Sequence, residues 1–207
     1  MAPEPSDGEL VARWNAVLAD GDREKIDAFL AEVDAHDATR EARLTRPGAL
    51  KGAAEWYAAN GIAVFRLQPR DKKPFPGSRG FKDATTNLAQ VRAWWTATPD
   101  ANIGIPTGHG FDVIDIDPPD GPLSLLELRD AGLVPEVIGK VITPRYGDHL
   151  YVRASGDGNT AGLLPGIDYR GLGGYVVAPP SIGPNGVRYT WTRPLDLAAV
   201  QAQAKAA

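Results

Sequence analysis

Apolar residues recur at helical spacing in the N-terminal part of the chain. Leu10, Trp14 and Leu18 would share one face of a helix, and the same spacing returns from Ile26 after a short polar interruption. Apolar side chains three and four residues apart form one stripe along a helix, with charged side chains on the other positions. We therefore expect a helical appendage over residues 1–48, which packs on the main domain or serves an interaction.

Helix and strand patterns alternate from residue 49 onward. Stretches of helical spacing are followed by short runs of β-branched and aromatic residues, with Gly and Pro between them. Several connections are too short for the crossovers that parallel strands need, so the strands should pair antiparallel. We expect a mixed α/β chain of the α+β class, with a main domain over residues 49–194 and a helix or linker over residues 195–207 that leads to a further domain. The expected helices cover residues 50–60, 87–95 and 123–130, and the expected strands cover residues 62–67, 103–105, 113–117, 137–142, 149–153, 166–169, 175–178 and 188–191.

Two aspartates interrupt an apolar strand that runs from Val113 to Asp117. Because side chains alternate between the faces of a strand, Asp115 and Asp117 should share one face while Ile114 and Ile116 share the other. Their Cα atoms would lie about 6.5 Å apart, which lets both carboxylates hold one or two hard cations. Asp is disfavoured inside strands, and a buried pair of like charges needs neutralisation. The pattern therefore favours a metal site over two solvent-facing aspartates at a strand end.

Composition and charge narrow the classes of protein. The 207 residues are 43% hydrophobic, carry a net charge of −4 and include no cysteine. Disulfides, cysteine-ligated zinc and thiol nucleophiles are therefore excluded, and the composition suits a cytoplasmic location. The first residues lack the basic and apolar regions of a signal peptide, and no apolar run approaches the ~20 residues that span a bilayer, so we expect no membrane partner. The mild negative charge still leaves room for a local basic patch.

Three later segments each carry a weak signal for chemistry. TPRYGDHLYV leads from a loop into a strand that carries His149, and GIDYR places Asp168 inside an apolar run. GGYVVAPPS has glycines that suit a turn and prolines that end a strand. A lone His or Asp at such positions is more often structural than functional. Their order along the chain is more specific: D-x-D, then His, then an Asp in an apolar run followed by Arg and a Gly-Gly strand.

That order resembles the archaeo-eukaryotic primase superfamily, and in particular the bifunctional primase-polymerase (prim-pol) domains of plasmid and phage replication proteins. The resemblance covers residues 49–192, from AAEWYAANGIAVFRLQPRDKKPF through IGIPTGHGFDVIDID and TPRYGDHLYV to GIDYRGLGGYVVAPPS. It implies a catalytic core with an RRM-like antiparallel sheet. Two features depart from the pattern: without Cys the zinc module of some relatives cannot form, and RYGD precedes His149 where relatives often have small residues.

The resemblance also implies roles for individual residues. Asp115, Asp117 and Asp168 would hold two divalent ions, Mg²⁺ or Mn²⁺, and His149 would contact the phosphates of the incoming nucleotide. Two metals bridged by carboxylates activate a 3′-hydroxyl and stabilise the leaving pyrophosphate, and a group such as His149 stabilises charge on the triphosphate. Further nucleotide contacts are expected from Arg170, Lys73, Ser181, Thr107 and Gly108.

The function that the resemblance implies is template-directed nucleotidyl transfer. The protein would be a DNA primase and polymerase that makes or extends primers on single-stranded DNA, with dNTPs or NTPs as substrates. A role in phage or plasmid replication would imply a helicase as a fused or associated partner. It would also imply the cytoplasm of a bacterial host as the location. Alanine at Asp115 or Asp117 would then abolish nucleotide incorporation and leave the fold intact.

Cations and aromatic rings concentrate between residues 66 and 82, where Phe75 and Phe81 lie among the basic side chains. Such mixing suits single-stranded nucleic acid, through phosphate attraction and base stacking. A solvated loop anchored by two rings explains the pattern equally well. Trp94 and Trp95 are expected to be half core and half surface rather than a stacking platform. The expected DNA-binding residues are Arg66, Arg70, Lys72, Arg79 and Lys82.

Other functions stay open at this point. A glycosyltransferase also uses D-x-D to bind a metal and a nucleotide-sugar, but it leaves the His149 and Asp168 motifs unexplained. A non-catalytic nucleic-acid-binding module of a replication complex would tolerate alanine at the three acids, and a metal nuclease would use the same ions for hydrolysis. An EF-hand calcium loop does not fit, because Pro119 takes the fifth position and the glycine spacing fails.

Overall fold

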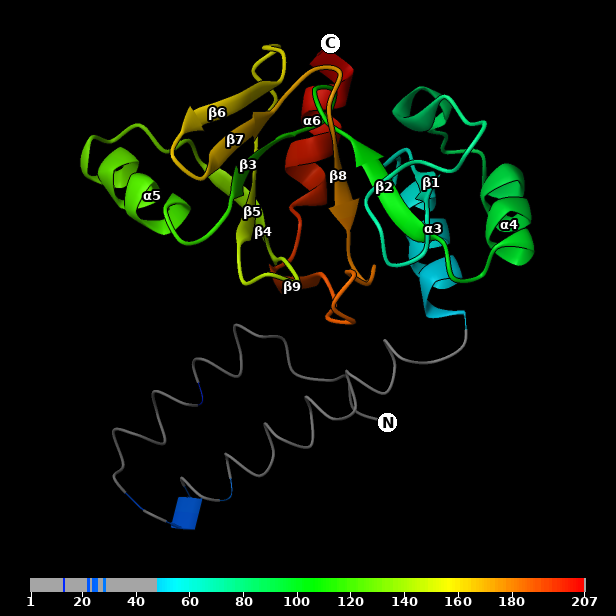
Figure 1. Ribbon diagram of the computed structural model, residues 1–207, viewed down its shortest axis with the longest axis horizontal. Coiled ribbons are helices and arrows are strands. Elements are labelled where there is room, and N and C mark those ends of the chain that lie inside the picture. Colours follow the sequence, from blue (N-terminus) through cyan, green and yellow to red (C-terminus); the bar gives the residue numbers. More distant parts are fainter. Residues whose placement is uncertain (1–12, 14–21, 23, 26–27, 29–47, 207) are drawn as a thin grey trace. The chain divides into compact units, whose positions relative to one another are not determined.

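Figure 1 shows the computed structural model of the chain, which describes residues 48–206 together with residues 13, 22, 24–25 and 28. The chain divides into two compact units, residues 1–49 and residues 50–207. The helical appendage predicted over residues 1–48 lies almost wholly outside the described residues, so that prediction stays a prediction.

The helices begin and end where local sequence signals place them. The helix α4 (Leu88–Ala97) starts after Asn87, whose side chain accepts hydrogen bonds from the backbone N–H groups of Ala89 and Gln90, as an N-cap does. The helix α3 (Ala49–Ala59) ends before Gly61, which takes a φ of 82° that glycine adopts without strain. None of the described helices has the length and apolar character to cross a bilayer. In the described part of the chain, the helices are α3 (Ala49–Ala59), the 3-10 helix η1 (Gly80–Asp83), α4 (Leu88–Ala97), α5 (Gly121–Asp130) and α6 (Leu197–Ala206).

The strands form two antiparallel sheets, which confirms the α+β class. The smaller sheet has the strand order β1-β2-β8, and the larger has the order β6-β7-β3-β5-β4-β9. β3 lies inside the larger sheet with β7 on one side and β5 on the other. The strands are β1 (Phe65–Leu67), β2 (Asn102–Pro106), β3 (Asp112–Ile116), β4 (Val137–Ile142), β5 (Asp148–Val152), β6 (Thr160–Leu164), β7 (Ile167–Arg170), β8 (Tyr175–Ala178) and β9 (Thr190–Arg193).

Most strands lie within two residues of their predicted bounds, and two strands, β1 and β6, differ more than that for physical reasons. β1 begins at Phe65 rather than at residue 62, because the Ile62 N–H donates back to Tyr57 O at the end of α3. β6 was not predicted at all. Its first four residues are exposed and the fifth is half-buried, so the strand lacks the alternation of buried and exposed positions that identifies a strand in sequence. It lies at the edge of the larger sheet, where one partner strand is enough to hold it.

A shared core joins the two sheets into one body. The largest cluster of buried side chains includes Ile103 of the smaller sheet, Val113 and Tyr151 of the larger sheet, and residues of α3, α4 and α6. The opposite face of the larger sheet packs Ile114 and Ile116 beneath α5, which lies beside β3 and β7 in Figure 1. Both faces of β3 are therefore covered, and polar side chains on this strand need specific partners.

Candidate active site

The register of the larger sheet brings three predicted site residues side by side. Asp115 on β3 is directly opposite His149 on β5 and directly opposite Asp168 on β7. Directly opposed residues of antiparallel strands project from the same face, so side chains from three separate stretches of sequence form one row across the sheet. This is the face that carries Val113, whereas Ile114 belongs to the cluster beneath α5. The alternation expected for β3 is confirmed.

Arg170 links two carboxylates of this row. It follows Asp168 by two positions on β7 and therefore lies on the same face. Arg170 Nη2 lies 2.5 Å from Asp168 Oδ2 and 3.4 Å from Asp115 Oδ2. The other oxygen of Asp168, Oδ1, accepts a hydrogen bond of 2.7 Å from the Gly162 N–H. Asp168 thus turns toward Asp115, and the two carboxylates share one guanidinium group.

His149 is the most buried member of the row, with 6% of its surface exposed. Its Nε2 atom lies 3.5 Å from Asp115 Oδ1. Burial lowers the pKa of His149 below its ordinary value, and the nearby carboxylate of Asp115 offsets only part of that effect. The imidazole is therefore neutral at pH 7. Among the described residues, no hydrogen-bond partner reaches its Nδ1 atom.

Asp117 lies one residue past the end of β3, and its backbone is held on both sides. Its N–H donates to Gly166 O at 2.8 Å, and its carbonyl accepts from the Gly121 N–H at 2.9 Å. The side chain is 48% exposed, and its Oδ1 atom lies 3.6 Å from Arg145 Nη2. Arg145 comes from the loop before β5, so Asp117 faces the segment that leads to His149.

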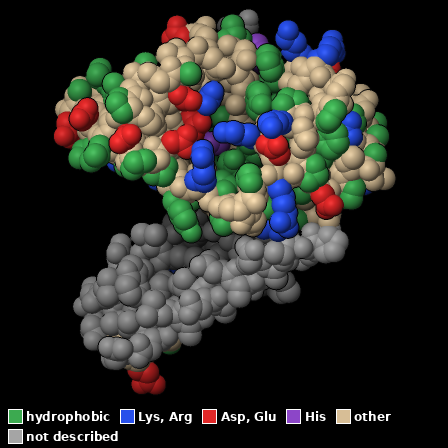
Figure 2. Space-filling view, in the orientation of Figure 1, with side chains coloured by type: hydrophobic (Ala, Val, Ile, Leu, Met, Phe, Trp, Pro, Cys, Tyr) green, Lys and Arg blue, Asp and Glu red, His purple; other side chains and the backbone are tan. Residues whose placement is uncertain are grey.

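The acidic side chains of the site are paired with arginines. Arg170 contacts Asp115 and Asp168, and Arg145 contacts Asp117. Figure 2 shows acidic and basic side chains next to one another at the centre of this face of the molecule. Within the described residues, no three His, Cys, Asp or Glu side chains converge as a ready-made metal group. The site is therefore a set of carboxylate oxygen donors whose negative charge is balanced by Arg145 and Arg170.

Aromatic side chains form the wall behind His149. The Tyr189 ring lies 5.8 Å from the imidazole, centroid to centroid, and the Tyr151 ring lies 4.8 Å from that of Trp191. Burial, followed by the charge of Asp115, raises the pKa of Tyr189 to about 12, so its hydroxyl stays protonated. Sequence reasoning missed Tyr189 and Arg145 as site residues. Neither stands in a spaced acidic motif, and only the packing of the loops against β5 reveals them.

Three predicted nucleotide contacts have partners within the scaffold. Thr107 Oγ1 donates to Gly171 O at 2.7 Å, and Ser181 Oγ accepts from the Ile103 N–H at 2.8 Å. Both side chains are at most 1% exposed. Gly108 has a φ of 97°, and a Cβ atom there would lie 2.3 Å from the Leu172 Cα atom. These residues connect neighbouring turns and strands, and their contact with a nucleotide stays a prediction.

The predicted basic segment divides into two groups. Arg70, Lys72, Lys73, Arg79 and Lys82 are exposed; Arg79 pairs with Asp83 at 2.7 Å. The hydroxyl of Tyr175 donates to Lys72 O at 3.0 Å, which fastens this loop beside β8. Arg66 differs from the rest, because it is half-buried and its guanidinium lies against two aromatic rings.

A comparison with protein families matches residues 54–202 to the model of the bifunctional DNA primase/polymerase N-terminal domain, Prim-Pol. The chain belongs to this family. The match spans the elements from α3 to α6 and so contains both sheets and the whole row of β3, β5 and β7. Family membership supports a function of the DNA primase/polymerase type in DNA replication. No curated protein matches the chain.

Proposed function

We propose that the protein is a template-directed nucleotidyltransferase that makes or extends primers on single-stranded DNA from dNTPs or NTPs. One observation carries the proposal: Asp115, His149 and Asp168 lie side by side in the sheet register, within the region that matches the Prim-Pol family. Cytoplasmic replication of a phage or plasmid, with a helicase as a fused or associated partner, would be its setting.

The donor chemistry fits two divalent ions, Mg²⁺ or Mn²⁺. Carboxylate oxygens are the preferred ligands of these hard cations. The fit is supported by Arg170, since two carboxylates from different strands already converge on this one cationic group. Asp115, Asp117 and Asp168 would be the ligands. When bound, the ions would lower the barrier by activating the 3′-hydroxyl and stabilising charge on the leaving pyrophosphate.

The other residues would bind and orient the triphosphate. Arg170, released from the carboxylates, would pair with phosphate oxygens, because a guanidinium presents several N–H donors in a fixed fork. Arg145, which lies beside Asp117, would add positive charge at the site, and the exposed Lys73 is a further proposed contact with the nucleotide. His149 is neutral and lies between Asp115 and Tyr189. A neutral imidazole has one N–H group, so His149 would donate one hydrogen bond to a phosphate oxygen.

Primer extension with conservative variants tests this proposal. Asp115→Asn and Asp168→Asn keep the size of each side chain but remove its charge. We expect incorporation of labelled nucleotide in Mn²⁺ or Mg²⁺ to fall by more than about 100-fold, since even outer partners of metal ligands cost 10–100-fold. Asp130→Asn is the matched control, because Asp130 is exposed at the end of α5, the helix that covers the opposite face of the sheet. Binding of Mn²⁺ to the same variants, measured by calorimetry, should fall in parallel.

The competing functions give different results in the same experiment. Full incorporation by the two site variants would refute the assigned site. Cleavage of labelled DNA without nucleotides would identify a nuclease, and turnover of a nucleotide-sugar without template would identify a glycosyltransferase. A non-catalytic module would bind DNA and incorporate nothing. Parallel reactions with and without a primer separate primer synthesis from primer extension.

A further inference from the structure

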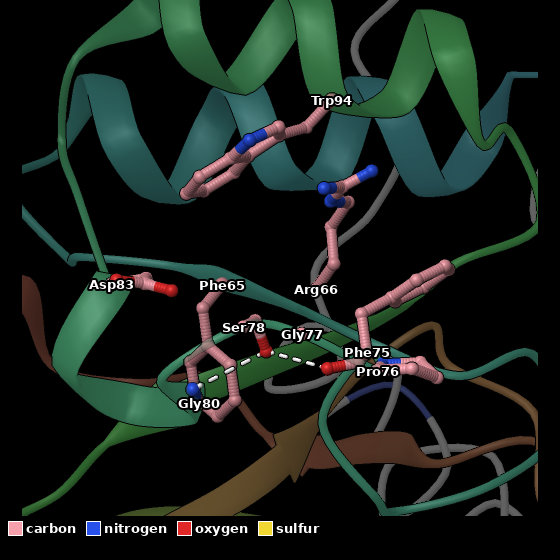
Figure 3. Close-up of a pocket in the computed structure, with 9 residues that line it drawn as sticks. All are labelled: Phe65, Arg66, Phe75, Pro76, Gly77, Ser78, Gly80, Asp83 and Trp94. Carbon is pink, nitrogen blue, oxygen red and sulfur yellow. Dashed lines mark hydrogen bonds between the residues drawn. The ribbon is translucent and has the colours of Figure 1, made fainter.

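A pocket lies on the smaller-sheet side of the molecule, apart from the row of acidic residues. It has about 260 Å³ of space and opens between α4 and the segment that joins β1 to η1. In Figure 3, Trp94 lies on one side of the space and Phe65 with Ser78 and Gly80 lies on the opposite side. Small-molecule sites usually hold roughly 300–1,000 Å³, so this pocket suits a single planar ring system rather than a whole nucleotide.

The two adjacent tryptophans of α4 have different roles. Trp95 is 1% exposed and its Nε1 donates to Ala101 O at 2.8 Å, so it anchors the helix in the core. Trp94 is half-buried and turns its ring toward the pocket. The sequence predicted one core and one surface ring here, and the structure confirms the division. The Trp94 ring borders the pocket beside the Arg66 guanidinium.

Arg66 and Phe75 complete an aromatic and cationic end of the pocket. The Arg66 Cζ atom lies 4.8 Å from the centre of the Phe75 ring and 5.4 Å from that of Trp94. Its Nη1 atom also donates to Thr98 Oγ1 at 3.1 Å, which holds the guanidinium in place. A cation over aromatic faces is favourable, and a guanidinium plane is itself a stacking surface for a base.

Polar groups line the opposite end of the pocket and its lower side. Asp83 lines the far end, where its carboxylate accepts hydrogen bonds from Arg79. Ser78 Oγ donates to Phe75 O at 2.7 Å and accepts from the Gly80 N–H at 3.3 Å. Oxygen atoms with remaining lone pairs can accept from the amino and imino groups on the edge of a nucleobase. The pocket therefore combines flat apolar walls with hydrogen-bond acceptors at the edge.

The charge around the pocket indicates that the planar ring that would occupy it belongs to a polyanion. Between residues 66 and 83 the chain has six Lys or Arg against two Asp, although its net charge is −4 overall. Five of these cations are exposed and are distributed along residues 70–82, the segment that forms one side of the pocket, and Arg79 pairs with the lining residue Asp83. Spread cations suit a run of phosphates along a strand better than the compact charge of one free nucleotide. The exposed cations are Arg70, Lys72, Lys73, Arg79 and Lys82.

We propose that this pocket takes one unpaired base of single-stranded DNA, which stacks on Trp94 beside Arg66 while the exposed cations of residues 70–82 hold the phosphates on either side. The occupant is the template strand that the proposed function requires, and in that sense the inference rests on that function. It assigns Trp94 to DNA binding, where the sequence pointed to the basic residues together with Phe75 and Phe81.

The test measures DNA binding without metal or nucleotide. Fluorescence anisotropy with a short labelled single-stranded oligonucleotide should show that Trp94→Ala weakens binding about 5- to 150-fold, the range found for loss of one stacked base. Trp94→Phe should recover most of the affinity, because a ring face remains. Trp56→Ala is the matched control: Trp56 is 48% exposed on α3 and does not line the pocket. An oligonucleotide with abasic sites should bind wild type more weakly and lose the difference between wild type and Trp94→Ala.

The outcomes separate this inference from the proposed function. Equal DNA affinity of Trp94→Ala and wild type, with both folded by circular dichroism, would overturn the pocket assignment even if primer extension proceeds. Displacement of the oligonucleotide by a mononucleotide at equal nucleotide concentration would also overturn it, because the pocket would then select a free nucleotide. Trp94-dependent binding with no incorporation of any nucleotide would instead support the pocket and refute the polymerase proposal.

Discussion

Tyr57 and Tyr151 are buried close together behind the row of site residues, and their hydroxyl groups differ in one respect. Tyr57 is 2% exposed, and its hydroxyl donates to Pro179 O at 2.8 Å and accepts from Trp191 Nε1 at 3.0 Å. Tyr151 is 0% exposed, and no described residue provides its hydroxyl with a hydrogen-bond partner. Substitution with Phe should therefore lower the free energy of unfolding at Tyr57, and leave it unchanged or raise it at Tyr151.

The magnitudes follow from the cost of unpaired buried groups. Tyr57→Phe loses two hydrogen bonds and leaves the Pro179 carbonyl and the Trp191 N–H without this partner, so it should lower stability by about 1–3 kcal/mol. For a domain of this size, 2 kcal/mol corresponds to a fall in Tm of about 4–8 °C. Tyr151→Phe removes a group that burial penalises and should be neutral or stabilising, by up to about 1–2 kcal/mol.

Urea unfolding followed by circular dichroism measures both variants against wild type, and equal m-values would show that the unfolded states are comparable. The double variant should show additive changes within about 0.5 kcal/mol if the two hydroxyl groups do not interact. A Tyr151→Phe variant that loses more stability than Tyr57→Phe would refute the reasoning, since the Tyr151 hydroxyl would then have a partner that stabilises the fold.

Two further predictions concern buried polar groups. Asp112→Ala should lower the free energy of unfolding by about 2–4 kcal/mol, because Asp112 Oδ2 accepts from the Ser155 N–H at 2.7 Å and from the Tyr169 hydroxyl at 2.5 Å. Primer extension at low temperature should persist, since the Asp112 side chain lies on the opposite face of β3 from Asp115. Loss of catalysis by a folded variant would contradict that placement. Burial raises the pKa of Tyr57, so above pH 10 the unfolded chain releases this proton while the folded chain keeps it, and stability should fall by about 1.4 kcal/mol per pH unit for this residue. Urea titrations at several alkaline pH values should show a shallower fall for Tyr57→Phe, and a slope equal to that of wild type would contradict this account.

Much of the fold follows from patterns that act over a few residues. The helical spacing of α3, the Asn87 cap of α4 and the alternation of β3 depend on local geometry, and the sequence alone predicts them. β6 was not predicted, because this exposed edge strand lacks the alternation of buried and exposed positions. In the same way, the buried roles of Thr107 and Ser181 depend on carbonyl and amide groups from distant segments, which no local pattern encodes.

The sequence by itself determined that Asp115 projects from one face of β3, because alternation is a property of every extended strand. Only the tertiary structure decided which residues meet it there. The pairing of β3 with β5 and β7 places His149 and Asp168 at its sides, and a shift of register by one residue would turn them to the other face. The same holds for Arg66, whose guanidinium lies between rings from two other segments. Register and packing join residues that are far apart along the chain, so these contacts exist only once the whole domain is folded.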